Sequence, residues 1–352
     1  MADHKLTVFA TGNGDSILIE AHGFKILTDI NYKTNSEEDY PDLGAELWDA
    51  CPDARLDLFV LTHPDVDHVR GFADVFHTGA PDRHSPRSKI LVDEIWCSPY
   101  GANPNYVTDE AKPLIDEIRR RHRLAGTPAG QLDGNRLRVL TAGDGEDSGQ
   151  LCDGIHWELL APTAQEAEIP SAPSGEPENS SNASSLVLRW SVQVGGASNA
   201  ILLGGDSTAP VWDRIYRDNQ HLPGRMSWNI LVSPHHTSRY ALGQKDQADQ
   251  FHFWPDAVTA LSQCHGNGWI VSSSKPVLED GDDPPSPDAK RKYVEILGGA
   301  DDRFLCTGTH GDGGKPGNVV FYLTNAGPAR TRRGSRSGSA AATAVTGGGN
   351  YG

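Results

Sequence analysis

Four residues of the segment 61–71, LTHPDVDHVRG, could together hold metal ions. His63, Asp65, Asp67 and His68 place two histidines and two aspartates within six positions. Imidazole nitrogens and carboxylate oxygens are the atoms by which proteins usually hold first-row divalent metals. On a tight turn, donors at this spacing can converge on one or two ions. HxDxDH at a fixed spacing is a fairly specific pattern, and we interpret it as a metal site rather than a polar turn.

Three apolar runs end on residues of this kind. LDLFVLTH, which leads into the metal-binding segment, is almost wholly apolar and predicts a strand buried on both faces. NAILLGGD ends on Asp206, and WNILVSPHH ends on His235 and His236. The polar ends of the three strands could meet along one edge of a sheet, which would bring all these side chains to one site.

The rest of the chain predicts one domain and a tail. The first forty residues alternate short apolar runs with glycine turns, which is typical of β-hairpins, and strand-like and helix-like segments alternate after them. Residues 1–326 are predicted to form the domain, with a long polar loop over 165–185. Residues 327–352, rich in Gly, Ser and Ala with four arginines, predict a disordered tail. The alternative for the tail is a nucleic-acid tether.

Composition excludes several classes of protein. The chain has 352 residues, 37% of them hydrophobic, enough for a substantial core. Its formal charge of −16 opposes a purely electrostatic binder of DNA or of anionic membranes. Five widely spaced cysteines without a CxxC pair indicate no disulfide framework. Without a signal sequence or an apolar window of membrane-spanning length, a soluble cytoplasmic protein with no membrane contact is expected. The sequence does not show whether the protein has protein partners.

Several stretches resemble the metallo-β-lactamase superfamily, most closely the metallo-hydrolase domain of the DNA-uptake protein ComEC and its soluble relatives. TGNGDSILIE is similar to that group's GQGDAxLI segment, and THPDVDHVRG is similar to its HxDxDH(x)GG motif. NASSLVLRW followed by AILLGGDS resembles NNxSLVLxL…LLxGD, and LVSPHHTSRY resembles KxPHHGS. The ending of this last segment also resembles the transfer-RNA-maturing nucleases. The likeness runs from about Leu6 to Leu323.

The resemblance implies both a fold and a set of ligands. The fold would be an α/β, four-layer αβ/βα metallo-β-lactamase sandwich, with two mixed β-sheets between outer helices and metals at the edge of the sheets. The cofactors would be two divalent ions, Zn²⁺ or Mn²⁺. Asp206 would bridge them, with the other ligands divided as follows: Asp67, His68 and His235 for one ion, and His63 and Asp65 for the other.

Two histidines of the family pattern have no counterpart here. The histidine expected ahead of the bridging aspartate is replaced by SSNASS. The first site, that of His63 and Asp65, has therefore lost a ligand or borrows Asn182, Ser184 or Ser185. This site should be the weaker and more oxygen-rich one. A later tyrosine-glycine-histidine-proline stretch is replaced by KPVLEDGDDPPSPDAKRK. Candidates to substitute for its histidine are His236, Lys275, His265 and His310.

Further residues could support the metals or the reaction. Asp67 and His236 are the candidate catalytic residues. Asp15, in the turn NGDS, could orient a metal-binding histidine without contacting the metal itself. Asp29 could have the same role. The alternative for Asp15 is that it only caps a hairpin.

The predicted activity is metal-assisted hydrolysis. Two ions sharing a bridging hydroxide require no serine or cysteine nucleophile, and the resemblance favours a phosphodiester in nucleic acid or a nucleotide. The basic run RRRHR at 119–123 could line a groove for it, although the solvated end of a helix is the favoured interpretation.

Two other functions stay open. One is hydrolysis of a small ester, lactone or thioester, which a closed pocket lined by Trp190, Trp212, Trp254 or Trp269 would favour. The other is a metal-stabilised regulatory or interaction module without turnover.

Overall fold

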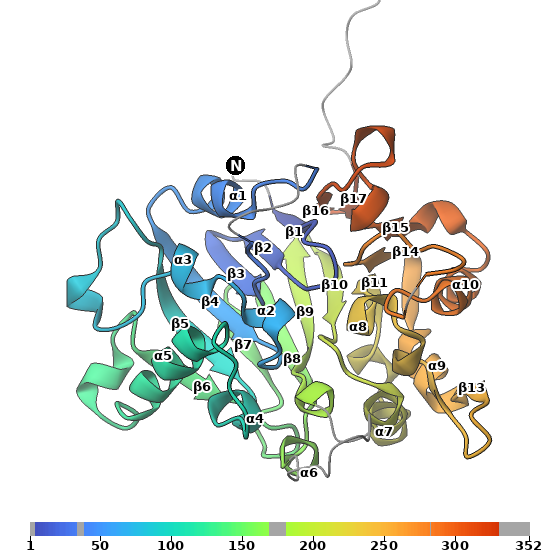
Figure 1. The fold of residues 1–352 in the computed structure, drawn as a ribbon, viewed down its shortest axis with the longest axis horizontal. Helices are drawn as coiled ribbons and strands as arrows, with labels where there is room; N and C mark the ends of the chain where they lie inside the picture. Colours follow the sequence, from blue (N-terminus) through green and yellow to red (C-terminus); the bar gives the residue numbers. More distant parts are fainter. Residues whose placement is uncertain (1–3, 34–38, 169–180, 282, 331–352) are drawn as a thin grey trace, which may run out of the picture.

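The chain folds into two β-sheets packed face to face, with helices on both outer faces (Figure 1). The computed structural model describes residues 4–33, 39–168, 181–281 and 283–330. The predicted fold class, a four-layer αβ/βα sandwich with two mixed sheets between outer helices, is confirmed. Within the described ranges, no helix is both long enough and apolar enough to cross a bilayer.

The first sheet has eight strands in the order β17-β16-β1-β2-β3-β4-β5-β6. Neighbouring strands from β17 to β3 run antiparallel, and those from β3 to β6 run parallel. The strands are β1 (Lys5–Val8), β2 (Ile17–Ala21), β3 (Phe24–Thr28), β4 (Arg55–Leu61), β5 (Leu91–Cys97), β6 (Arg136–Val139), β16 (Val319–Thr324) and β17 (Gly327–Ala329).

The second sheet has seven strands in the order β15-β14-β11-β10-β9-β8-β7. Strands β10, β11, β14 and β15 run parallel, so that their carboxyl ends lie at one edge. The strands are β7 (Ser148–Cys152), β8 (Ile155–Ala161), β9 (Val187–Val194), β10 (Ala197–Leu203), β11 (Trp228–Val232), β14 (Cys264–Ser272) and β15 (Phe304–Cys306). A separate hairpin pairs β12 (Gly243–Lys245) with β13 (Phe251–Phe253).

Helices cover the outer face of each sheet. Apolar side chains of α1, α3 and α5 pack on the first sheet, and those of α7, α9 and α10 pack on the second. The helices are α1 (Leu43–Ala50), α2 (Val66–Val69), α3 (Phe72–Val75), α4 (Pro99–Ala102), α5 (Lys112–His122), α6 (Ala164–Ala167), α7 (Ala209–Asn219), α8 (Pro234–Thr237), α9 (Pro255–Leu261) and α10 (Pro287–Ile296).

Strand β4 shows how the sequence pattern builds these layers. Leu58 and Val60 belong to the core between the sheets, whereas Phe59 and Leu61 belong to the core beneath the helices. All four side chains are almost completely buried, as the nearly continuous apolar run predicts. The strand therefore holds the segment that follows it between two packed layers.

The predicted domain boundaries need one correction. Residues 327–329 form β17, which pairs with β16, so the tail does not begin at 327. This pairing uses backbone groups, and the side-chain pattern therefore gave no sign of it. Of the predicted polar loop over 165–185, residues 165–167 belong to α6 and residues 181–184 form a 3-10 turn. Residues 169–180 and 331–352 lie outside the described ranges.

The basic run at 119–123 is only partly available to a ligand. Arg121 is buried, and its guanidinium donates to Glu117 Oε1 at 2.8 Å and to the carbonyls of Val92 and Arg136 at 2.9 and 3.0 Å. Arg120 donates two further hydrogen bonds to the Glu117 carboxylate at 2.7 and 2.8 Å. Arg121 thereby anchors α5 to β5 and β6. The run does form the end of a helix, as interpreted, but it is not fully solvated, and these two arginines are engaged within the fold rather than lining a groove.

We expect Glu117→Gln to lower the free energy of unfolding by about 3 kcal/mol at pH 7, because the buried Arg121 would lose its counter-charge. Burial raises the pKa of Glu117, but the hydrogen bond from Arg120 and the charge of Arg121 outweigh burial and hold this pKa below its ordinary value. A lowered pKa stabilises the folded protein above the ordinary glutamate pKa of about 4.3, and this contribution is lost as the pH falls through the folded-state pKa. Urea unfolding at pH 7 and below about pH 4 should therefore show the difference shrinking in acid.

Asp116→Asn, on the same helix, is the matched control. Its exposed pair with Lys112 contributes at most about 0.5 kcal/mol. Equal losses of stability in the two variants would contradict burial as the source of the Glu117 effect.

Candidate metal centre

The three predicted strand ends meet at one edge of the sandwich. Residues 63–68 follow β4 of the first sheet, and Asp206 follows β10 of the second. His235 and His236 follow β11, which lies parallel to and beside β10. The structure thus brings side chains of both sheets together, as the strand-end pattern predicted.

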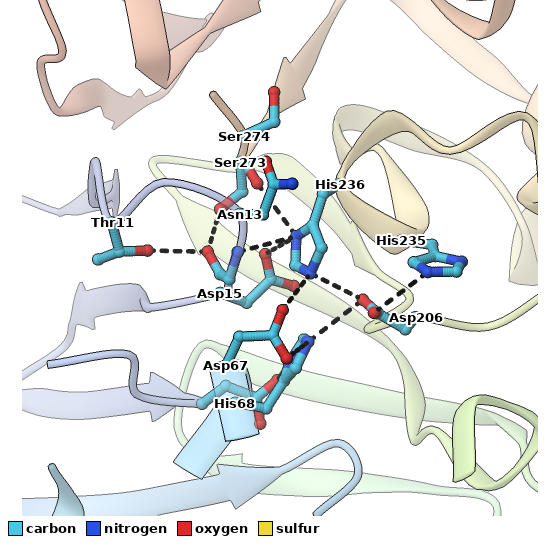
Figure 2. A network of polar contacts seen from close by, with 12 residues as sticks. Thr11, Asn13, Asp15, Asp67, His68, Asp206, His235, His236, Ser273 and Ser274 are labelled. Atoms are coloured by element: carbon cyan, nitrogen blue, oxygen red, sulfur yellow. Dashed lines mark hydrogen bonds and ion pairs between the residues drawn. The ribbon is translucent and has the colours of Figure 1, made fainter. Parts of the chain in front are cut away.

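Asp206 lies at the middle of this cluster (Figure 2). Its carboxylate is buried, with 5% of the residue exposed. Oδ1 is 3.3 Å from Nε2 of His68 and 3.3 Å from Nε2 of His236. Oδ2 is 3.7 Å from Nε2 of His235 and 4.0 Å from Nε2 of His63. Four imidazoles therefore surround one carboxylate.

The two aspartates of the HxDxDH motif, Asp65 and Asp67, lie on different sides of the cluster. Asp67 Oδ2 is 3.3 Å from His236 Nε2, and Asp67 Oδ1 is 4.0 Å from His68 Nε2. Asp65 Oδ2 is 3.5 Å from His63 Nε2. The motif thus places the Asp67 carboxylate beside His236 and His68, and the Asp65 carboxylate beside His63.

Several of these atoms are buried without a hydrogen-bond partner among the described residues. They are Nε2 of His63, His68 and His236 and Oδ1 of Asp206. Buried polar atoms are nearly always paired in native proteins, so this set of atoms is suited to holding a bound ion or water. Donor atoms of His63, His68 and Asp206 lie within 4.8 Å of one another, and so do those of Asp67, His68 and His236. Nitrogen and carboxylate oxygen at this spacing fit divalent metal ions.

The charges of the cluster are strongly coupled. Burial raises the pKa of Asp206, but the neighbouring His236 and His68 outweigh it and hold this pKa well below the ordinary value. Burial lowers the pKa of His68, but the Asp206 and Asp29 carboxylates raise it well above the ordinary value. The carboxylates thus favour a positive charge at this position, whether a proton or a metal ion carries it.

Asp29 fixes the orientation of His68. The carboxylate is fully buried, and its Oδ2 lies 2.7 Å from His68 Nδ1. It also accepts hydrogen bonds from the backbone N–H of Thr62 at 2.8 Å and from the Thr62 hydroxyl at 2.5 Å. The His68 ring is held with Nε2 toward Asp206, the arrangement by which carboxylates orient metal-binding histidines.

Asp15 lies behind His236 in a similar way. Its Oδ1 is 3.6 Å from His236 Nδ1, and the same nitrogen lies 3.1 Å from the carbonyl oxygen of Ser273. The Gly14 N–H also points at this nitrogen, at 3.3 Å, so Nδ1 has a donor and an acceptor beside it. In the tautomer with the proton on Nδ1, the ring donates to Ser273 and the Nε2 lone pair faces Asp67 and Asp206. The turn containing Asp15 therefore packs directly against the cluster.

The structure differs from the sequence prediction in the placement of the tandem histidines. His236, rather than His235, lies against Asp67 and His68. His235 and His236 have φ angles of +51° and +50°, and this left-handed turn directs His235 to the other side of Asp206 (Figure 2). A left-handed turn of non-glycine residues leaves no signature in the sequence.

The segment that lacks the family's histidine touches the cluster through a residue that the sequence prediction missed. The Ser181 hydroxyl donates to Asp65 Oδ1 at 2.5 Å. Asn182 Oδ1 and Ser185 Oγ are buried without a hydrogen-bond partner in the described part of the chain, whereas Ser184 donates to the Ser181 carbonyl. The only signal for Ser181 was its place in SSNASS.

The remaining substitute candidates lie apart from the cluster. The Lys275 side chain is exposed, and its backbone N–H donates to Asn13 Oδ1 at 3.0 Å. His265 lines a cavity of about 1000 Å³ at the amino ends of the parallel strands, away from the site. The His310 ring contacts Arg330. None of these three side chains reaches the four imidazoles.

Comparisons with known proteins concern the fold. No family model and no curated protein sequence matches the chain. Solved structures similar to it include the metallo-β-lactamase fold protein YhfI from Bacillus subtilis, at 11% identity and a TM-score of 0.44, covering 91% of this chain and 100% of that one. Another is Igni18, a metallo hydrolase from Ignicoccus hospitalis, at 14% and 0.40, covering 91% and 100%.

A third is CmlA, a diiron β-hydroxylase from Streptomyces venezuelae, at 10% identity and a TM-score of 0.46. The match covers 92% of this chain and 55% of CmlA, so the chain spans about half the length of that protein. Similarities at these identities and TM-scores provide no evidence about activity. The activity is therefore inferred from the residues of the site.

Asp29→Asn should weaken metal binding about 10- to 100-fold without unfolding the protein, because the amide holds the His68 ring less firmly and no longer balances its charge. Titration with Zn²⁺ or Mn²⁺ by calorimetry, beside thermal melting in EDTA, measures both effects. Asp74→Asn, an exposed change on nearby α3, is the control and should bind as the wild type does. Unchanged affinity in Asp29→Asn would show that the pair does not support a metal ligand.

Proposed function

We propose that this protein is a dinuclear metal-dependent hydrolase of the metallo-β-lactamase superfamily, acting on phosphodiester bonds of nucleic acid or of a nucleotide. The observation that carries the proposal is the buried Asp206 carboxylate, whose two oxygens lie 3.3 to 4.0 Å from the Nε2 atoms of four imidazoles. The order of the HxDxDH, GGD and PHH segments along the chain supports the superfamily.

The ligands would divide between two ions. Asp67, His68 and His236 would hold one, His63 and Asp65 would hold the other, and Asp206 would contact both. Two divalent ions, Zn²⁺ or Mn²⁺, would supply an activated water and a Lewis acid for the oxygen of the scissile bond. The protein then requires no serine or cysteine nucleophile.

The exposure of the ligands indicates the side from which substrate arrives. The side chains of Asp65 and Asp67 are 44% and 34% exposed, and that of His235 is 19% exposed. Those of His63, His68 and His236 are buried beneath them. Substrate would therefore approach over the two aspartates, while the buried rings keep their orientation through Thr62, Asp29 and Ser273.

Two features favour a phosphodiester. Three carboxylates contribute to the cluster, an oxygen-rich set that suits the harder ions used in phosphoryl chemistry. Lys33 and Arg70 line a cavity of about 510 Å³ beside the end of α2 and could neutralise a phosphate, although Asp74, Asp109 and Glu110 share that cavity.

The small-ester alternative receives less support. It would need an aromatic-lined pocket at the metals, but Trp190 and Trp212 are fully buried in the core. Trp269 lines the cavity at the amino ends of the parallel strands. A metal-binding module without turnover is the other alternative, and assays decide between the three.

Asp206→Ala and Asp67→Ala are each expected to lower phosphodiesterase activity by at least about 1000-fold, because each removes a ligand from the cluster. The measurement is hydrolysis of bis(p-nitrophenyl) phosphate, single-stranded DNA and a lactone by protein of known metal content, with Asp116→Ala, an exposed change on α5, as the control. Activity that survives loss of Asp206 would refute the bridging assignment. Metal-loaded wild type inert on all three substrates would favour the regulatory module.

A further inference from the structure

We propose that His235 is a ligand of the ion held by His63 and Asp65, called the first ion below. It would supply the imidazole that the segment 181–185 lacks. The tandem histidines would then divide between the two ions, one on each side of Asp206. This inference rests on the proposed dinuclear centre and assigns to His235 a different ion from the one that the sequence resemblance implied.

The distances around Asp206 form two similar sets. Oδ1 faces His68 and His236, both at 3.3 Å, and Asp67 lies 3.3 Å from the second of these rings. Oδ2 faces His63 at 4.0 Å and His235 at 3.7 Å, and Asp65 lies 3.5 Å from His63. Each carboxylate oxygen of Asp206 thus belongs to a group of two imidazoles and one further carboxylate.

The count of ligands favours this division. Without His235, the first ion would have only His63, Asp65 and one oxygen of Asp206. With it, each ion has four donors, the number that zinc usually takes from protein and water together. Ser181 already occupies Asp65 Oδ1 with its hydroxyl, so that Oδ2 is left to face His63.

The backbone explains how adjacent residues can serve different ions. His235, His236 and Thr237 all have positive φ, at +51°, +50° and +68°. Non-glycine residues rarely adopt this conformation, and they persist in it where the surroundings impose it. As a result the two rings have centroids 6.3 Å apart with planes at 75°, and they lie on opposite sides of Asp206 (Figure 2).

Buried hydrogen bonds impose this turn. The His235 N–H donates to the Gly205 carbonyl at 2.9 Å, one residue before Asp206. The Thr237 hydroxyl is bonded to the hydroxyls of Ser233 and Ser272 at 2.6 and 2.5 Å. The turn is thereby tied to β11, to β14 and to the loop that carries the bridging aspartate.

The two sites would differ in strength. His68 Nδ1 and His236 Nδ1 each have an acceptor, in Asp29 and Ser273. His235 Nδ1 is buried and has none among the described residues. A ligand histidine without such support binds metal more weakly, so the first ion should be lost first.

The test is metal stoichiometry of the full chain after dialysis against buffered Zn²⁺, with Co²⁺ spectra to identify each site. Wild type should bind two ions per chain. His235→Ala and His63→Ala should each lose the weaker ion, with affinity there falling more than about 100-fold. His236→Ala should lose the other ion. His265→Ala, a distant and exposed histidine, is the control and should keep both.

Double variants make the assignment specific. His63→Ala with His235→Ala should lose no more metal than either single change, whereas His63→Ala with His236→Ala should lose both ions. His235→Gln and thermal melting of every variant in EDTA exclude loss of fold as the cause.

The outcomes separate this inference from the proposed function. If His235→Ala and His235→Gln keep both ions at wild-type affinity and lose only turnover, His235 acts on substrate and the inference is overturned, while the dinuclear hydrolase stands. If wild type binds fewer than two ions, the dinuclear centre itself is refuted.

Discussion

The burial of the Asp206 carboxylate is the interaction on which the organisation of the candidate metal centre, at one edge of the sandwich, depends. An ionised carboxylate inside a protein is strongly unfavourable unless positive charge or hydrogen-bond donors compensate it. Here the compensation comes from four imidazoles, and the His236 and His68 charges outweigh burial and hold the pKa of Asp206 well below its ordinary value. That positive charge can be carried by protons on the imidazoles or by bound metal ions. The arrangement is therefore suited to binding metal.

The two sheets must stay in fixed register for this cluster to exist, because its ligands come from both. The Leu186 N–H donates to the Thr62 carbonyl across the sandwich at 3.0 Å, one residue before His63. Gly205 lies against the Thr62 side chain, where an added Cβ would come within 2.7 Å, and its φ is +49°. Only glycine satisfies both the contact and the conformation without strain. The apolar core between the sheets therefore sets the distance between the motif residues and Asp206.

The sequence predicted the parts of the site that follow from regular structure. His63, Asp67 and Asp206 stand at the ends of apolar runs, and parallel strands bring such ends to one edge. The roles of His235 and His236 could not be separated, because their side-chain directions depend on a left-handed turn that hydrogen bonds from distant residues impose. Ser181 was missed for a related reason, since its contact with Asp65 joins residues 116 positions apart. The four-layer arrangement followed from the resemblance, since the strand and helix patterns alone fit other α/β folds equally well.

The histidines on the two sides of Asp206 differ in the hydrogen bonds that hold their Nδ1 atoms, and this difference bears on how the site would work. His68 and His236 are backed by buried acceptors, whereas on the other side His63 Nδ1 meets the Thr62 hydroxyl at 3.1 Å and the Asp65 side chain is 44% exposed. The better supported ion would be deep and permanent, and the less supported one would be open to solvent. Substrate arriving over Asp65 would meet the weaker ion first. A substrate with anionic oxygens could add its own ligand there, so that binding of metal and of substrate would reinforce each other.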